Sequence, residues 1–328
     1  MDIYITLDYE LFLNDLTGDV DNCLITPTNK LCTILNKHNI KATFYIDMAY
    51  IYRIYELRDR YHNLAEDYLK VTRQVKELYN NGQQIGLHLH PQWFFSKYDG
   101  TQWIVDFEHY KLSDMPEQDA CSMFKACKIM LEQITGGKIC SFRAGGYSIQ
   151  TFHPFADLLQ ETGIKSDSSV LYKEKNLSRL HYYDYTDVPS SDSYTFNSDV
   201  TKAVEQGTLI EYPISTSRFN YLTYCLARMQ MQKMDDNSNW GNGGDLPSRH
   251  RHAFVRNIFN KMIKAINMPA SIDYQSFIFC DKVFKRYIKS RKKNLVIIGH
   301  PKNFSCASMK MLDAFIEKNK EKHHFLTI

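Results

Sequence analysis

Short apolar segments alternate with longer amphipathic segments along the first half of the chain. Runs with the length and composition of β-strands lie at residues 3–7, 41–46, 85–89, 139–142 and 164–166. Helical patterns separate them at residues 28–38, 61–81, 116–135 and 151–162. Such an alternation is typical of a parallel sheet whose strands are connected by crossover helices. The first half of the chain therefore predicts an α/β fold.

Beyond residue 170 the alternation is less regular. The pattern there predicts strands at residues 209–212 and 295–298, helices at residues 249–266 and 274–289, and a polar loop rich in Gly and Asn at residues 235–244. The sequence shows no internal repeat and no linker that would divide it. We therefore expect one domain over residues 1–328.

Polar residues suited to catalysis or ligand binding follow the predicted strands. In a parallel α/β fold, functional groups gather at the carboxyl ends of the strands, both in open sheets and in barrels. The residues at or just after such ends are Asp8, Glu10, His88, His90, Arg143, Asp167 and His300. We therefore expect these side chains to belong to one site.

The segment Gly-Leu-His-Leu-His-Pro at residues 86–91 gives the strongest chemical signal. Because side chains alternate along a strand, His88 and His90 point to the same side, and so do Asp8 and Glu10. Two histidines and a carboxylate with an open coordination position are typical of catalytic zinc, whereas structural sites are usually closed by four protein ligands. The alternative is a pair of partly exposed histidines that only make hydrogen bonds.

The charge balance argues against a nucleic-acid partner. The 328 residues include 40 Lys and Arg against 37 Asp and Glu, which gives a formal net charge of +3. Basic clusters at residues 249–256 and 282–293 are interpreted as solvated helix faces, with contact to an anionic partner as the alternative.

Neither a secretory signal nor a transmembrane segment is expected. Met1 is followed directly by the first strand, and no apolar stretch approaches the ~20 residues that cross a bilayer. The 8 cysteines are dispersed, without a Cys-x-x-Cys pair. We therefore expect a soluble, cytoplasmic protein with reduced thiols.

Six fragments, taken in order, resemble the motifs of the polysaccharide deacetylase superfamily (NodB homology, carbohydrate esterase family 4). They lie at residues 7–10, 41–45, 86–90, 141–147, 166–169 and 297–300. The resemblance spans residues 1–170 and returns at residues 294–304. It implies a distorted (β/α) barrel, in which the unmatched residues 171–293 form a large insertion or elaboration in the C-terminal half.

The resemblance also implies roles for the residues of the expected site. Asp8 would act as catalytic base, Arg143 would orient it, and His300 would be the general acid. A divalent metal ion, with zinc preferred, would be held by Glu10, His88 and His90.

Substrate contacts are expected near the same strand ends. The resemblance assigns an oxyanion-binding backbone N–H near Tyr147 and a supporting role to Asp167. Trp93 follows the histidine motif and offers a flat ring for sugar stacking, with packing of a long loop as the alternative. The chain departs from the family pattern in two places: Tyr9 separates the two acidic residues, and one residue instead of three or four separates the histidines.

These implications predict a metal-dependent hydrolase that removes an N-acetyl or O-acetyl group from a sugar. A cytoplasmic location favours a nucleotide-linked or lipid-linked N-acetyl sugar made for surface polysaccharide, such as O-antigen or capsule. One alternative is a sugar-binding member of the same fold that has lost catalysis. Another is an amidohydrolase that acts on a small amide other than a sugar.

Overall fold

A curled, largely parallel sheet forms the centre of the computed structural model, which describes residues 1–234, 236–244 and 265–328. Nine strands of the described residues make up this sheet, in the order β10-β11-β7-β6-β3-β2-β1-β14, with β15 also paired to β1. Their bounds are β1 (Asp2–Tyr9), β2 (Thr43–Asp47), β3 (Gln84–Leu89), β6 (Ser141–Ala144), β7 (Ser166–Asp167), β10 (Tyr194–Phe196), β11 (Leu209–Glu211), β14 (Asn294–Gly299) and β15 (His324–Leu326). Only the edge strand β10 pairs antiparallel within this sheet.

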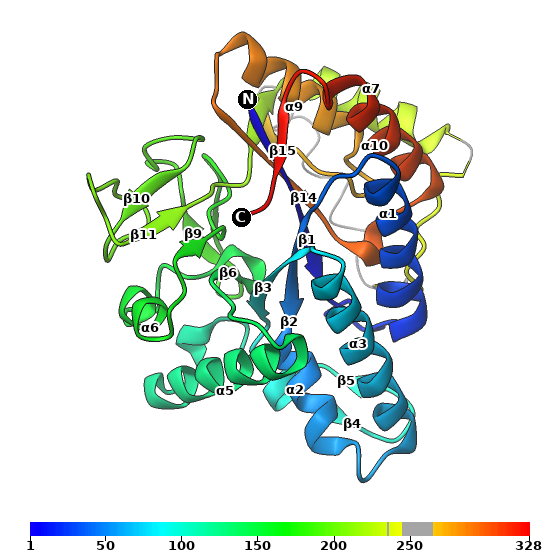
Figure 1. Ribbon diagram of the computed structural model, residues 1–328, viewed down its shortest axis with the longest axis vertical. Helices are drawn as coiled ribbons and strands as arrows, with labels where there is room; N and C mark the ends of the chain where they lie inside the picture. Colours follow the sequence, from blue (N-terminus) through cyan, green and yellow to red (C-terminus); the bar gives the residue numbers. More distant parts are fainter. Residues whose placement is uncertain (235, 245–264) are drawn as a thin grey trace.

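Helices surround the curled sheet (Figure 1). The larger ones are α1 (Thr26–Lys37), α2 (Met48–Leu57), α3 (His62–Asn80), α5 (Glu117–Thr135), α6 (Phe155–Glu161), α7 (Tyr221–Gln232), α9 (Ile278–Lys289) and α10 (Cys306–Asn319). Local signals fix several of their ends. Gly136, for example, ends α5 with a φ of 80°, a left-handed conformation that glycine adopts without strain. This architecture confirms the predicted α/β fold of the distorted (β/α) barrel type.

Shorter elements form the loops at the rim of the sheet. They are η1 (Asp21–Ile25), α4 (Gln92–Phe95), η2 (Leu112–Asp114), η3 (Gly145–Tyr147), η5 (Pro301–Asn303) and the strand pairs β4 (Lys97–Tyr98) with β5 (Trp103–Ile104), β8 (Lys175–Leu177) with β9 (Tyr182–Asp184), and β12 (Thr216–Phe219) with β13 (Ile266–Pro269). Within the unmatched stretch 171–293, β11 extends the main sheet because it pairs with β7. The division into one domain with an insertion stays a prediction.

Most predicted elements of the first half are present with shifted ends. The pattern did not predict α2, which follows β2 without an intervening turn, nor α10. Residues 249–264 of the helix predicted at residues 249–266 lie outside the described residues. Its last residue, Ile266, begins strand β13 and is not helical. Among the helices of the described ranges, none combines the length and the apolar character needed to cross a bilayer.

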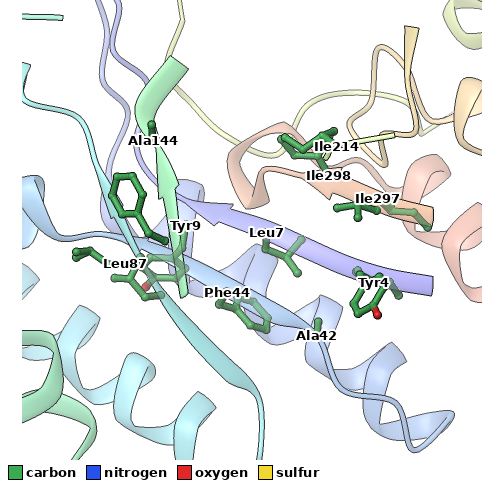
Figure 2. Packing of buried hydrophobic residues seen from close by; sticks show 14 of the residues in the cluster. Tyr4, Leu7, Tyr9, Ala42, Phe44, Leu87, Ala144, Ile214, Ile297 and Ile298 are labelled. Carbon is green, nitrogen blue, oxygen red and sulfur yellow. The ribbon is translucent and has the colours of Figure 1, made fainter. Parts of the chain in front are cut away.

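Apolar side chains of neighbouring strands set the register of the sheet. Leu7 of β1 lies opposite Phe44 of β2, and Leu87 of β3 lies opposite Phe142 of β6, and all four are fully buried. Figure 2 shows Leu7, Phe44 and Leu87 within this layer. Burying each such side chain contributes about 1.5–3 kcal/mol. Because a slip by one residue would turn every side chain to the other face, this packing also fixes where the polar strand ends point.

Candidate active site and metal centre

Glu10, His88 and His90 meet at the carboxyl ends of β1 and β3. The Nε2 atom of His88 lies 3.0 Å from Oε2 of Glu10, and Nε2 of His90 lies 2.5 Å from the same oxygen. One ligand atom from each residue lies within 4.8 Å of the others, and all three residues are buried. The structure thus brings together the three residues that the sequence predicted as metal ligands.

The other ring nitrogens of the two histidines are held by oxygen atoms. His88 Nδ1 lies 2.7 Å from the backbone oxygen of Arg143, and His90 Nδ1 lies 3.3 Å from Oε1 of Gln92. Because these oxygens only accept hydrogen bonds, each Nδ1 is the donor to them, and each Nε2 is the nitrogen that faces Glu10. Two imidazole nitrogens and a carboxylate oxygen could therefore hold a divalent metal ion here.

Lys302 is a member of this site that the sequence did not predict. Its Nζ donates to Oε1 of Glu10 at 2.8 Å and to the backbone oxygen of Leu11 at 2.7 Å. Burial alone would raise the pKa of Glu10, but Lys302 and His90 hold that pKa well below its usual range. Glu10 is therefore an ionised carboxylate whose second oxygen faces the two histidines.

Arg143 fixes Asp8 at the end of β1. Arg143 Nη1 donates to Oδ1 of Asp8 at 2.6 Å, and Nη2 donates to Thr6 Oγ1 and to Ser168 Oγ, each at 2.8 Å. The guanidinium is fully buried and lies over the ring of Tyr45, 4.3 Å from its centroid. Burial raises the pKa of Asp8, but Arg143 and the nearby histidines outweigh it, so the pKa is lowered and Asp8 stays ionised.

His300 approaches the same carboxylates from the end of β14. Its Nε2 lies 3.6 Å from Oδ2 of Asp8 and 3.9 Å from Oε1 of Glu10. On the other side of the ring, Nδ1 lies 2.8 Å from Oδ2 of Asp273, whose Oδ1 accepts the backbone N–H of His300, also at 2.8 Å. Burial lowers the pKa of His300, but Asp273, Asp8 and Glu10 together raise it to about 9. At neutral pH the His300 side chain is therefore a positively charged imidazolium, with a proton on both ring nitrogens.

Trp93 lies behind the site rather than on its open side. Its ring is fully buried, and Nε1 donates to Oδ2 of Asp47 at 2.9 Å. The other oxygen of Asp47 accepts the backbone N–H of His90 at 3.2 Å. Trp93 and Asp47 therefore brace the turn that carries His90, and this burial leaves no face of Trp93 for sugar stacking.

Asp167 is likewise fully buried, one layer behind Arg143. Its Oδ1 accepts the Ser169 hydroxyl at 2.6 Å, and Ser169 Oγ in turn accepts the backbone N–H of Ala144 at 2.8 Å. Asp167 thus contacts the strand that carries Arg143, and no substrate could reach its carboxyl group without rearrangement.

Tyr147 follows β6 in a tight left-handed turn. Gly146 has a φ of 57° and Tyr147 a φ of 63°, which is strained for a residue with a side chain. The Tyr185 hydroxyl donates to the backbone oxygen of Tyr147 at 2.5 Å and holds the turn in place. Burial raises the pKa of Tyr147, and the Asp8 carboxylate raises it further.

Sequence reasoning missed Asp273 and Lys302 because nothing around them marks them locally, and it missed Asp47 although this residue directly follows the strand predicted at residues 41–46. Each acts through a partner far away in the chain, for example Lys302 through Glu10. The signal that could have found them is topological, since β14 lies beside β1 and the residues after both strands share one edge of the sheet.

Comparisons with known proteins agree with this architecture. A model of the polysaccharide deacetylase family matches residues 15–165. This range includes His88, His90, Arg143 and Tyr147 but ends before His300 and begins after Glu10. A search of curated proteins found no match.

Three solved structures illustrate the similarity. A polysaccharide deacetylase candidate from Mycobacterium smegmatis is 13% identical, with a TM-score of 0.52 over 99% of this chain and 86% of that one. A CE4 family pseudoenzyme from Bacillus anthracis is 11% identical, with a TM-score of 0.43 over 99% and 63%. A family 4 acetyl xylan esterase from Clostridium thermocellum, in complex with a cobalt ion, is 16% identical, with a TM-score of 0.25 over 44% and 48%. The first of these shares the fold.

Proposed function

We propose that the chain is a member of the polysaccharide deacetylase superfamily and a hydrolase that removes an acetyl group from a sugar, because a model of that family matches residues 15–165. The observation that carries the proposal is the convergence of Glu10, His88 and His90 beside Asp8 and His300 at one edge of the sheet. A site with three metal ligands of this kind and an ionised carboxylate next to them has the composition of a hydrolytic centre.

We propose Glu10, His88 and His90 as ligands of a divalent ion, with zinc as the first choice because of its preference for imidazole and carboxylate. When bound, such an ion supplies Lewis acidity for a carbonyl oxygen and for a water molecule. The buried position of the three side chains limits the access of bulk water and strengthens their interaction with a cation.

Asp8 and His300 would divide the proton transfers between them. Asp8 is ionised and held by Arg143, so it can take a proton from the attacking water. His300 is protonated because its pKa is raised to about 9, and its Nε2 lies 3.6 Å from Asp8 Oδ2. It can therefore give a proton to the departing group. This proton matters most for an N-acetyl substrate, because an amine leaves poorly as an anion. The turn at Tyr147 would place a backbone N–H toward the developing oxyanion.

We propose an N-acetylated sugar as the substrate, with an O-acetylated sugar as the second choice. A nucleotide-linked or lipid-linked intermediate of surface polysaccharide synthesis, such as O-antigen or capsule, and a cytoplasmic location form the finer part of the proposal. The family match supports an acetylated carbohydrate as the substrate, whereas the linkage of the sugar and the cytoplasmic location are expectations from the sequence.

One observation favours a second candidate, a sugar-binding protein without catalysis. Both carboxylate oxygens of Glu10 already have partners: Oε1 accepts from Lys302, and Oε2 contacts His88 and His90. The negative charge of Glu10 is therefore compensated without a metal ion. A metal ion would have to replace the contacts between Glu10 and the two histidines.

Metal analysis and acetate release test the proposal together. The purified protein should hold one divalent ion that His88→Ala and Glu10→Ala lose and that His109→Ala, a partly exposed histidine, keeps. Acetate should appear from a panel of N-acetylated and O-acetylated sugars and stop on chelation. Binding of sugars without any acetate release would favour the second candidate, and release that survives chelation would remove the metal from the mechanism.

A further inference from the structure

A separate cavity of about 310 Å³ lies on the same end of the sheet as the proposed active site. Its walls come from three loops or helix starts that follow strands: residues 15–20 after β1, Tyr50 in the first turn of α2 after β2, and the β4–β5 region after β3. The start of α3 supplies Asp67. This volume falls at the lower end of the ~300–1,000 Å³ range of small-molecule pockets.

Trp93 separates this cavity from the metal ligands. Trp103, which lines the cavity, packs edge-on against Trp93 with ring centroids 5.3 Å apart, and Tyr50 packs on the same ring at 4.9 Å. Trp93 in turn is tied through Asp47 to the His90 turn. The cavity is therefore distinct from the catalytic centre but shares a wall with it.

Three side chains that line the cavity carry polar groups that make no hydrogen bond within the described residues. Tyr50 is only 2% exposed, and its hydroxyl makes no hydrogen bond within residues 1–234, 236–244 and 265–328. Tyr50 and Asp67 line the same cavity, and after burial the Asp67 carboxylate contributes most to the raised pKa of Tyr50. Asp67 and the Trp103 indole N–H also make no hydrogen bond with the part of the chain that the structure describes. A ligand or water that enters the cavity can make hydrogen bonds with these groups.

These free groups define the chemistry of a ligand. Tyr50 and Trp103 can donate hydrogen bonds and Asp67 can accept them, which matches a ring whose hydroxyls do both. The half-buried ring of Tyr98 offers apolar surface for the C–H side of such a ring. Neither lysine nor arginine occurs among the described residues that line the cavity, so a phosphate would find no counter-charge.

We propose that this cavity binds a neutral saccharide ring and is a second carbohydrate contact beside the catalytic centre. The inference rests on the proposed function in assuming a carbohydrate substrate. A substrate with more than one sugar unit, or a second glycan chain, would then be held at a site apart from the acetyl group that reacts.

Calorimetric titration with cellotriose, xylotriose and triacetylchitotriose tests the proposal on the full chain. Tyr50→Phe removes one hydroxyl and Asp67→Asn removes one charge, and each should weaken binding of the trisaccharide that wild type binds by about threefold to tenfold. Tyr52→Phe on the same helix and Glu66→Gln beside Asp67 are matched controls that lie outside the cavity lining, and they should bind as wild type does.

Acetate release from an acetylated monosaccharide, measured on the same variants, separates this inference from the proposed function. Weakened trisaccharide binding together with unchanged acetate release supports the second contact. Weakened binding in a chain that releases no acetate also supports it, while it removes the deacetylase proposal. Equal affinities in wild type, Tyr50→Phe and Asp67→Asn, or no binding of any of the three trisaccharides, would overturn the inference. Binding of calcium instead of sugar, if Asp67→Asn abolishes it, would also overturn the inference.

Discussion

Asp8 is the residue whose chemistry and placement can be tested most directly. Asp8→Asn keeps the size of the side chain and an oxygen for Arg143 but removes the proton acceptor. Because general-base catalysis contributes about 10²–10⁴-fold, turnover should fall by at least 10²-fold while the metal content stays at the wild-type level. Steady-state acetate release and elemental analysis measure the two quantities.

Asp2→Asn is the matched control for this change, because Asp2 begins the same strand and pairs with His324 at the far end of the sheet. It should leave turnover as in wild type. Turnover of Asp8→Asn within threefold of wild type would show that another group accepts the proton.

Asp273 should control the pH at which His300 loses its proton. Asp273 is the largest of the groups that raise the pKa of His300 to about 9, against the lowering effect of burial. A general acid must be protonated, so the wild-type rate should fall as the pH rises through about 9. In Asp273→Asn that fall should move to lower pH by roughly one unit or more.

The pH profile of kcat/KM measures this shift. The control is Asp281→Asn, since Asp281 is a partly exposed residue that pairs with Lys285. An unshifted profile with a uniformly lower rate would mean that Asp273 only positions the ring.

At the scale of elements, the pairing of β7 with β11 places two acidic groups together. The register puts Glu211 directly opposite Asp167, and both carboxyls are fully buried. Burial raises the pKa of both residues, and for Glu211 the Asp167 carboxylate raises it further. Glu211 Oε1 accepts the backbone N–H of Val170 at 3.1 Å, so the pair supports the segment that leads away from Ser169. The raised pKa of each carboxyl favours its protonated form, so the pair can share a proton.

Glu211→Gln should therefore stabilise the protein at high pH. A carboxyl whose pKa is raised on folding adds stability below its unfolded pKa of ~4.3 and loses it as the pH rises through the folded pKa. The unfolding free energy of wild type should thus fall relative to the variant by up to about 1.4 kcal/mol per pH unit over that range. The amide of Gln can still accept from Val170 and can donate to Asp167.

Denaturant unfolding at pH 5, 7 and 9 measures this difference, with the exposed Glu205→Gln as control. A difference between Glu211→Gln and wild type that does not change with pH would contradict the shared proton.

For the whole molecule, the sequence predicted what depends on local periodicity. The two-residue period placed Asp8 and Glu10, and likewise His88 and His90, on one side, whereas the pairing of Arg143 with Asp8 was expected from the family resemblance. The sequence could not predict partners that are chosen by the packing of distant strands, such as Asp273 for His300 or Glu211 for Asp167. Helix α2 was missed because its apolar and aromatic residues continue directly from β2 without a turn signal.

The position of the metal ligands also predicts how metal affects global stability. Glu10 follows β1 and His88 ends β3, and β2 lies between these strands in the sheet. An ion bound to both would bridge non-adjacent strands of the folded state and bind the unfolded chain far less. At a free concentration of 100 times its Kd it should add about 2.7 kcal/mol to the unfolding free energy. Chelation should therefore lower the Tm by roughly 5 °C.

Apo protein should nevertheless stay folded at 25 °C, because Lys302 compensates the charge of Glu10 without an ion. Thermal unfolding with and without chelator gives the shift. The His88→Ala variant should show none, whereas His62→Ala, whose side chain is 90% exposed, should respond as wild type does. An equal shift in His88→Ala would place the stabilising ion elsewhere in the molecule, and the three residues at the ends of β1 and β3 would then have only a structural role.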